Sequence, residues 1–257
     1  MDSTDHTFVI CAYKESEFLE DCILSLKEQS LKSKIIMYSS TPNDFIKSLG
    51  EKYAIPFYTK PGGGIGKDWN NALSFVTTKY ATIAHQDDVY LNQYLKKIIE
   101  KVDEDTLIVY SDYKEWKNGE IIAKNLNLKI KHAMLNAISL FPKNKFWRLR
   151  ILAFGNPICC PAVTYNLDKL NAFKFNETMK VSLDWLAWYE IGKMEGNFQF
   201  INHDLMYHRI HEDSETTNTI SDNTRTKEDI LMYRKFWPRP VAELLMKFYA
   251  KSQTTNN

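Results

Sequence analysis

The feature that most constrains the fold is the alternation of strand-like and helix-like segments over the first hundred residues. Short apolar runs typical of buried strands occur at residues 6–13, 33–40, 55–60 and 80–88. Between them, apolar residues recur at helical spacing at residues 16–30, 41–53 and 61–78, with Ser16 as a candidate N-cap of the first helix. Short strand–helix–strand units need crossover connections between parallel strands, so this pattern predicts an α/β fold with a mostly parallel sheet.

Beyond residue 106 the alternation is looser. A chain of 257 residues fits one large domain or two small ones, and no repeat or linker divides it. We expect strands at 106–116 and 119–126, a helix at 132–141, a loop and then a strand or turn at 155–170, a helix closed by Gly196 at 182–196, and an alternating strand at 198–217 that runs into a polar loop.

Polar residues follow three of the predicted parallel strands. They are residues 12–15, 39–44 and 85–88. Ligands of open α/β sheets bind outside the carboxyl ends of the strands, so these three segments should converge on one crevice.

Adjacent carboxylates, Asp87 and Asp88, end the fourth of these strands. One of them could bind a divalent cation while the other accepts a hydrogen bond from a ribose hydroxyl. Carboxylate oxygens favour magnesium or manganese, and such an ion would neutralise a diphosphate. The alternative is an ordinary polar turn at a strand end.

A glycine cluster at residues 61–66 precedes the third helix. Glycines let the backbone approach a ligand closely, and a helix start offers free amide hydrogens. The cluster matches neither the Walker loop nor the dinucleotide fingerprint. A flexible turn before a helix is the alternative.

Two further segments carry residues suited to chemistry. Asp184 lies between Leu183 and Trp185 on a largely apolar helix, where its pKa could be raised so that it acts as a general base towards a hydroxyl. In the segment 207–217, Arg209 could clamp a phosphate and His211 could bind a metal or a leaving diphosphate. The alternatives are an exposed helix carboxylate and a polar surface cluster.

Charge and cysteine usage exclude several classes of protein. The net charge of +1 gives no reason to expect nucleic acid as a partner, although residues 121–167 contain basic residues and no acidic one. This basic segment could face phosphate, anionic lipid, an acidic acceptor or solvent. The four cysteines lack disulfide or zinc-finger spacing and suit a reducing cytoplasm. No run of about 18 apolar residues predicts a membrane span.

Taken in order, these segments resemble glycosyltransferase family 2 with a GT-A fold. The resemblance covers residues 6–215 and rests on the segments 8–30, 60–73, 85–88, 182–185 and 207–217. It implies a single catalytic domain over residues 1–240, with a nucleotide-binding half at about 1–112 and an acceptor half at about 113–240. Residues 241–257 would form a C-terminal helix and a disordered tail.

The resemblance also implies roles for individual residues. The end of the first strand, with Ala12, Tyr13 and nearby Glu15, would line the nucleotide pocket. Asp87 would contact the ribose or help to hold the metal, and Asp88 would coordinate the metal that bridges the diphosphate. Asp184 would be the catalytic base of an inverting transfer. His211, together with Arg209, would close over the diphosphate, and we count His211 with Asp88 as a metal ligand.

This sequence departs from the family pattern at several places. The family commonly has acidic residues after the second strand, where one reads the nucleobase, but Tyr38, Ser39 and Ser40 stand there instead. Gln86 occupies a position that is often acidic. Lys67 lies where an arginine is common and could supply the charge for the phosphate. We place Ser39, Lys67, Asn70 and Gln86 among the donor-binding residues.

The function implied is transfer of a sugar from a nucleotide-diphosphate sugar, with UDP or dTDP as the nucleotide and manganese or magnesium as the metal. The acceptor would be a saccharide or a lipid-linked or protein-linked hydroxyl, in glycan, polysaccharide or glycoprotein synthesis. We expect a cytoplasmic location, with peripheral contact to the inner face of the membrane and a homo-oligomer as further options. A catalytically weak nucleotide-sugar-binding subunit and a metal-dependent nucleotidyltransferase are the alternative functions.

Overall fold

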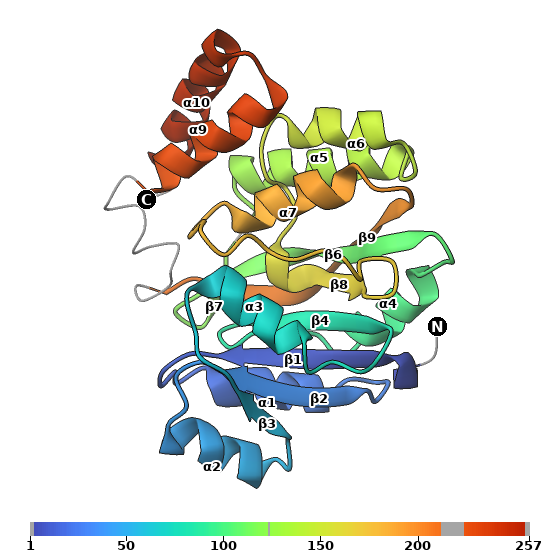
Figure 1. The fold of residues 1–257 in the computed structure, drawn as a ribbon, viewed down its shortest axis with the longest axis vertical. Helices are drawn as coiled ribbons and strands as arrows, with labels where there is room; N and C mark the ends of the chain where they lie inside the picture. Colours follow the sequence, from blue (N-terminus) through green and yellow to red (C-terminus); the bar gives the residue numbers. More distant parts are fainter. Residues whose placement is uncertain (1–2, 123, 212–223, 255–257) are drawn as a thin grey trace.

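The computed structural model describes residues 3–122, 124–211 and 224–254 (Figure 1). Within them the expected α/β fold is confirmed, and its sheet has the strand order β3-β2-β1-β4-β8-β6-β9-β5, with β7 paired to β6. The strands are β1 His6–Ala12, β2 Lys34–Ser39, β3 Phe57–Thr59, β4 Tyr80–His85, β5 Val89–Tyr90, β6 Thr106–Lys117, β7 Glu120–Ile121, β8 Val163–Asn166 and β9 Asn197–Arg209.

Most strands of the sheet point in one direction. Strand β1 pairs in parallel with β2 and β4, β2 with β3, and β6 with β9. Strand β8 is antiparallel to both β4 and β6, so it joins the two parallel groups without reversing their common direction. The carboxyl ends of β1, β2, β4, β6 and β9 therefore meet at one edge of the sheet, which is where ligands of such sheets bind.

Helices cover both faces of the sheet, and a pair of C-terminal helices packs at one end of the molecule (Figure 1). Two 3-10 turns, at Ser3–Asp5 and Cys160–Ala162, complete the regular structure of the described residues. The helices are α1 Leu19–Lys27, α2 Asp44–Lys52, α3 Ile65–Leu73, α4 Tyr94–Lys101, α5 Leu126–Leu140, α6 Lys145–Leu152, α7 Leu183–Gly192, α9 Thr224–Phe236 and α10 Arg239–Thr254.

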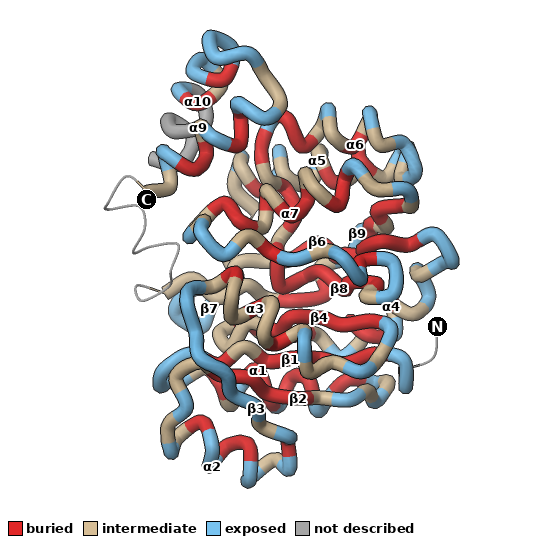
Figure 2. Tube along the Cα trace, in the orientation of Figure 1, coloured by how far each residue is buried: buried red, intermediate tan, exposed pale blue. Residues whose placement is uncertain are grey.

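Two apolar layers separate the helices from the sheet. Successive residues of a strand face opposite sides, so Val9 of β1 packs with α3, α7 and α6, whereas Phe8 and Ile10 pack with α1, α2 and α4. Figure 2 shows the buried residues running along the central strands, with exposed residues on the outer helices. A smaller cluster joins α9 and α10 to Trp185 of α7.

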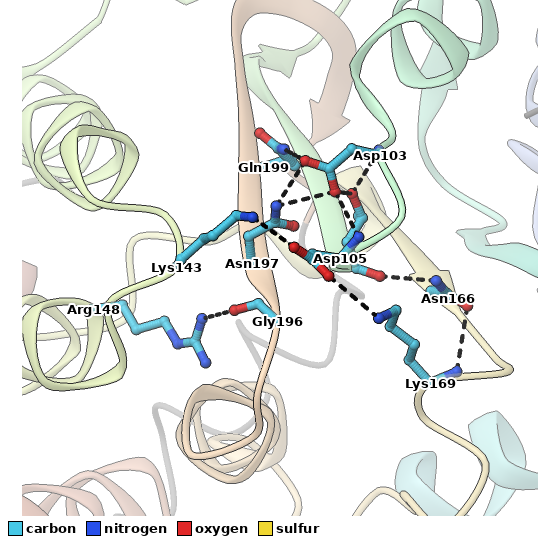
Figure 3. A network of polar contacts seen from close by, with 10 residues as sticks. Asp103, Asp105, Lys143, Arg148, Asn166, Lys169, Gly196, Asn197 and Gln199 are labelled. Carbon is cyan, nitrogen blue, oxygen red and sulfur yellow. Dashed lines mark hydrogen bonds and ion pairs between the residues drawn. The ribbon is translucent and has the colours of Figure 1, made fainter.

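Polar contacts tie together the edge of the sheet opposite the strand carboxyl ends (Figure 3). Asp103 accepts hydrogen bonds from Asn197 and Gln199 at the start of β9, and Lys143 lies 2.6 Å from Asp105. Gly196 enters β9 with a φ of +132°, and a Cβ there would lie 2.6 Å from the carbonyl oxygen of Asp105. Only glycine fits this turn, which explains why Gly196 separates α7 from β9.

The structure corrects the expected start of the first helix. Helix α1 begins at Leu19, and Phe18 rather than Ser16 is its N-cap residue. The Ser16 hydroxyl instead donates to Asp87 Oδ1 at 3.2 Å, across 71 residues of sequence. The sequence also gave no sign of the two-residue strand β5. Within the ranges the structure describes, no helix combines the length and apolarity that a bilayer crossing requires.

Candidate active site

Asp88 lies buried where β4 and β9 end. Its Oδ1 accepts hydrogen bonds from His208 Nδ1 at 2.9 Å and from the backbone N–H of Arg209 at 3.0 Å. Its Oδ2 is also buried and has no hydrogen-bond partner among the described residues. Burial alone would lower the pKa of His208, but the Asp88 carboxylate raises it above its ordinary value. A buried carboxylate oxygen without a partner is costly, which makes it a candidate ligand for a cation.

Asp87 faces a different set of partners from Asp88. Its Oδ1 accepts from the Ser16 hydroxyl, and its Oδ2 lies 3.3 Å from His211 Nε2. The two predicted metal ligands, Asp88 and His211, thus contact different groups here: His208 pairs with Asp88, and His211 pairs with Asp87. The polar residues that follow, 212–217 of the predicted motif, lie outside the described residues.

The guanidinium group of Arg209 is held between two aromatic rings. It lies 4.2 Å from the ring centres of both Phe18 and Trp116. Its Nε donates to the Asp87 carbonyl oxygen at 2.9 Å, and its Nη2 donates to Asp21 Oδ2 at 2.9 Å. Arg209 therefore anchors the end of β9 to α1 and to the aspartate turn, while its expected contact with a diphosphate stays a prediction.

Gln86 connects the ends of β4 and β1. Its Oε1 accepts from the Tyr13 N–H at 2.8 Å, and its Nε2 donates to the Tyr13 carbonyl at 3.1 Å. This reciprocal pair extends the β1–β4 ladder by one side chain and fixes the backbone after Ala12. Ala12 is buried, whereas Tyr13 and Glu15, just beyond the end of β1, are exposed.

His85 precedes Gln86, and the sequence motifs predict no role for it. It is the last residue of β4, and its ring stacks on Trp69 of α3 with the ring centres 5.3 Å apart. Burial lowers the pKa of His85 below its ordinary value, which favours the neutral ring. His85 thus packs α3 against the sheet beside the aspartates.

An acidic residue that the sequence analysis missed stands at the end of β2. Asp68, in the first turn of α3, accepts from the Ser40 hydroxyl at 2.7 Å and from the Tyr38 hydroxyl at 3.3 Å. It occupies the region where acids were expected directly after the second strand. Ser39 is buried, and its Oγ accepts from the Thr41 N–H at 3.0 Å. A carboxylate from the helix after the glycine cluster thus lies beside the end of β2, although the strand itself ends without an acidic residue.

Asn70 of α3 binds the segment that leads to α7. Its Oδ1 accepts from the Phe175 N–H at 2.8 Å, and its Nδ2 donates to the Phe175 carbonyl at 2.9 Å and to Glu177 at 3.0 Å. Gly66 is packed against the same segment, since a Cβ there would lie 1.9 Å from the Asn176 carbonyl oxygen. Lys67 lies in the same turn, with its side chain along Gly63.

Asp184 lies in the first turn of α7, partly buried. Its Oδ2 accepts from Asn156 Nδ2 at 2.7 Å, and its Oδ1 accepts from the Trp185 N–H at 2.7 Å. Burial raises the pKa of Asp184 to about 6, while these hydrogen bonds and the charges of Arg225 and Lys131 oppose the increase. Such a carboxylate is ionised at neutral pH yet is more basic than an exposed aspartate.

Cys159 and Lys131 interact electrostatically with Asp184 and with groups of the aspartate turn. Burial raises the pKa of the Cys159 thiol, and the charges of Asp88 and Asp184 both add to this increase. Cys159 therefore lies within electrostatic reach of both carboxylates. The positive charge of Lys131 of α5 opposes the increase in the pKa of both Asp184 and His208.

No group of three or more His, Cys, Asp or Glu side chains in the described parts of the chain could hold a metal ion by itself. Magnesium and manganese commonly take one or two carboxylates and complete their coordination with substrate phosphates and water. The unpartnered Asp88 Oδ2, with Asp87 beside it in the chain, fits that kind of shared site.

Comparison with known proteins identifies a family and a fold. The family model described as glycosyl transferase family 2 matches residues 7–170, and no curated protein matches the sequence. S. aureus TarS 1–349 in complex with UDP-GlcNAc aligns with a TM-score of 0.65 at 14% identity, covering 96% of this chain and 70% of that one. The chain spans 42% of the longer TarS structure.

A mannosyltransferase, PcManGT from Pyrobaculum calidifontis, was solved in complex with GDP-Man and Mn2+. It aligns with a TM-score of 0.62 at 14% identity, covering 95% of this chain and 69% of that one. At such identities the likeness concerns the fold, and it confirms the expected GT-A architecture. The structural match extends over α7 and β9, which the family model does not reach.

Proposed function

The chain belongs to glycosyl transferase family 2 and is a glycosyltransferase, and on that premise we propose that it transfers a sugar from a nucleotide-diphosphate donor to an acceptor hydroxyl with inversion. The observation that carries this proposal is the placement of Asp184. A partly buried carboxylate with a pKa of about 6 is suited to accept the proton of an attacking hydroxyl near neutral pH. A single displacement with one general base inverts the anomeric centre.

The nucleotide would bind between the ends of β1 and β2. Asp68, oriented by the hydroxyls of Tyr38 and Ser40, offers a carboxylate oxygen to an N–H donor of the base. Uracil and thymine each present one such N–H between two carbonyl oxygens, which supports UDP or dTDP as the nucleotide. TarS was solved with UDP-GlcNAc, and PcManGT with GDP-Man. A donor panel should therefore include both kinds of base.

The diphosphate would lie over the aspartate turn. Asp88 would hold a divalent cation through its Oδ2, with Asp87 and His211 beside it. When bound, that cation supplies positive charge to the departing diphosphate. The chain itself orients Asp88 through His208 and the Arg209 N–H, and Lys67 adds charge from the glycine cluster.

The acceptor would approach Asp184 from the side of α5. The charge of Lys131 acts on the pKa of Asp184, and the exposed apolar side chains Leu126 and Ile130 belong to the same helix, α5. This combination supports an acceptor with an apolar portion, and we propose a lipid-linked saccharide ahead of a free saccharide or a protein. Peripheral contact with a membrane would follow from such an acceptor.

A donor screen followed by one substitution tests the proposal. Thermal shift with UDP-Glc, UDP-GlcNAc, dTDP-Glc and GDP-Man, each with manganese, identifies the donor. Asp184→Asn should then abolish transfer and donor hydrolysis while calorimetry shows nearly unchanged donor binding, because the base acts on the acceptor and not on the nucleotide. An Asp184→Asn protein that still turns the donor over would remove Asp184 from the mechanism.

A further inference from the structure

The segment that delivers Asp184 is held by a carboxylate from far along the chain. Glu228 of α9 accepts hydrogen bonds from three consecutive backbone N–H groups, those of Lys180, Val181 and Ser182, at 2.8, 2.8 and 3.0 Å. Its Oε1 takes the first and its Oε2 takes the other two. Glu228 is 8% exposed, so these bonds form in a site largely shielded from water, where charge-assisted hydrogen bonds are strong.

This contact anchors the residues that lead into α7. Ser182 is the N-cap residue of α7, but its side chain makes no capping hydrogen bond to the helix. Its hydroxyl donates instead to Asp229 Oδ1 at 2.7 Å, and Asp229 is also buried. The N-terminus of a helix carries free N–H groups and partial positive charge, which a carboxylate stabilises. Two adjacent acids of α9 thus hold the entry to α7, through the N–H groups of residues 180–182 and the Ser182 hydroxyl.

Helix α9 is itself fixed against the elements around Asp184. Tyr233 packs edge-on against Trp185 with ring centres 5.1 Å apart, and its hydroxyl donates to the Phe154 carbonyl. The Trp237 indole donates to the Ala153 carbonyl at 2.8 Å. Because these contacts hold α9 rigidly on α6 and α7, the Glu228 carboxylate is a fixed point rather than a mobile surface group.

We propose that Glu228 is a positioning residue for catalysis, which sets the location of Asp184 by capping residues 180–182. The proposal rests on the role of Asp184 as the base. Only Leu183 lies between Ser182 and Asp184, so a shift of the segment that Glu228 holds moves the Asp184 carboxylate directly. Misplacement of a catalytic group by about 1 Å can cost about a hundredfold in rate.

The opposite end of the same segment is held by the donor side of the site. Asn70 and Gly66 of α3 fix Phe175 and Asn176, which lie five and four residues before the first residue that Glu228 binds, Lys180. The chain from 175 to 182 is thus fastened at one end to the helix that follows the glycine cluster and at the other to α9. This arrangement couples the location of Asp184 to both halves of the domain.

Hydrogen exchange and kinetics on Glu228→Gln and Glu228→Ala test the proposal. The control is Glu243→Gln, which changes an exposed acid of α10 that pairs with Arg239 of the same helix. The amide hydrogens of residues 180–182 should exchange at least tenfold faster in both Glu228 variants than in the wild type. In the control, their exchange rates should be unchanged. The substrate is the sugar nucleotide that the wild type hydrolyses among UDP-Glc, UDP-GlcNAc, dTDP-Glc and GDP-Man. In both Glu228 variants, the kcat for this hydrolysis should fall by about tenfold to a hundredfold, while the Kd for the donor should stay unchanged.

A pH profile separates positioning from a general loss of stability. Loosening residues 180–182 admits water to Asp184 and lowers its pKa from about 6 towards 3.8, so the acidic limb of kcat should move to lower pH in Glu228→Ala. The groups that face Asp184 are unchanged in this variant: Arg225 of α9, Lys131 of α5, the thiols of Cys159 and Cys160, and Tyr165 of β8.

The outcomes distinguish the positioning role of Glu228 from the proposed role of Asp184 as the catalytic base. If Asp184→Asn is inactive while Glu228→Gln has normal kcat and an unshifted profile, the positioning role is wrong and the base is retained. If Asp184→Asn is active, the proposed mechanism itself fails, and only the exchange result still bears on the cap. If Glu228→Ala does not fold, Glu228→Gln gives the same readings, because its amide keeps the volume of the side chain but cannot accept all three N–H groups.

Discussion

The side-chain amide of Gln86 makes both of its hydrogen bonds to one residue, Tyr13, accepting from its N–H at 2.8 Å and donating to its carbonyl at 3.1 Å. A carboxylate could accept the first bond but could not donate the second. The amide at this position, where the family often has an acid, is therefore explained by the geometry of the β1–β4 junction.

Gln86→Glu should accordingly weaken the protein and its donor site together. The new carboxylate would face the Tyr13 carbonyl oxygen and add negative charge beside Asp87. Loss of the donated bond should cost about 1 kcal/mol of unfolding free energy in urea. Donor affinity should fall because the backbone after Ala12 loses a restraint. Gln93→Glu at the N-cap position of α4, where the side chain makes no capping bond, should leave donor affinity unchanged.

The second amide clamp predicts a different coupling. Asn70→Asp would keep the bond from the Phe175 N–H but would place a carboxylate against the Phe175 carbonyl and against Glu177. We expect a loss of about 1–2 kcal/mol in unfolding free energy. Adding Glu177→Gln should restore part of it, which a double-mutant cycle would measure. If Asn92→Asp, an exposed control, is equally destabilising, the clamp is not the cause.

Asp68 provides a test of nucleobase recognition. Asp68→Asn turns one of the two acceptor oxygens into a donor, which opposes the N–H of uracil. UDP affinity by calorimetry should therefore fall about tenfold or more, whereas inorganic diphosphate, which lacks the base, should inhibit as in the wild type. Equal loss for both ligands would place the effect on the glycine cluster rather than on base recognition.

Asp88 is the proposed metal ligand and also the hydrogen-bond partner of His208, so one substitution should change both metal binding and the pKa of His208. In Asp88→Asn, the component of UDP affinity that depends on manganese should disappear, so that calorimetry with manganese and with EDTA gives the same Kd. The pKa of His208 should fall below its ordinary value, because burial remains while the attraction of Asp88 is lost. NMR titration of the ring would record this fall. Asp21→Asn, which removes only the exposed partner of Arg209, should leave the manganese dependence intact.

Local patterns sufficed to predict the parallel strands and the convergence of their ends. Hydrophobic periodicity depends on residues close in sequence and predicts the strands and helices. The rule that crossover helices join parallel strands then predicts that the strands run in the same direction. Asp87, Asp88 and Gln86 could be placed for that reason. For the central antiparallel strand β8, the local pattern allows a strand or a turn, because its pairing with β4 and β6 depends on contacts remote in sequence.

The same limit explains which residues of the site were missed. Asp68 was not recognised because its partners Ser40 and Tyr38 come from a different element, and Glu228 because its partners lie 46–48 residues away. Lys131 and Asn156 reach Asp184 from segments without any motif. A motif marks residues that are close in sequence, whereas the second half of this site is assembled by packing.

The raised pKa that suits Asp184 to act as a base should also make the free energy of unfolding depend on pH. Its pKa is raised in the folded protein from 3.8 to about 6, so between these values the folded state binds more protons than the unfolded state. Unfolding free energy should then decrease as pH rises through this interval and stay lowered above it. A shift of about 2 units in a partly buried group corresponds to about 2 kcal/mol after allowance for solvent screening.

Asp184→Asn should therefore be more stable than the wild type at pH 8 and should lose that advantage below about pH 4. Urea unfolding across this range, with Asp44→Asn as an exposed control on α2, would measure the difference, and an advantage of equal size at both pH values would contradict the raised pKa.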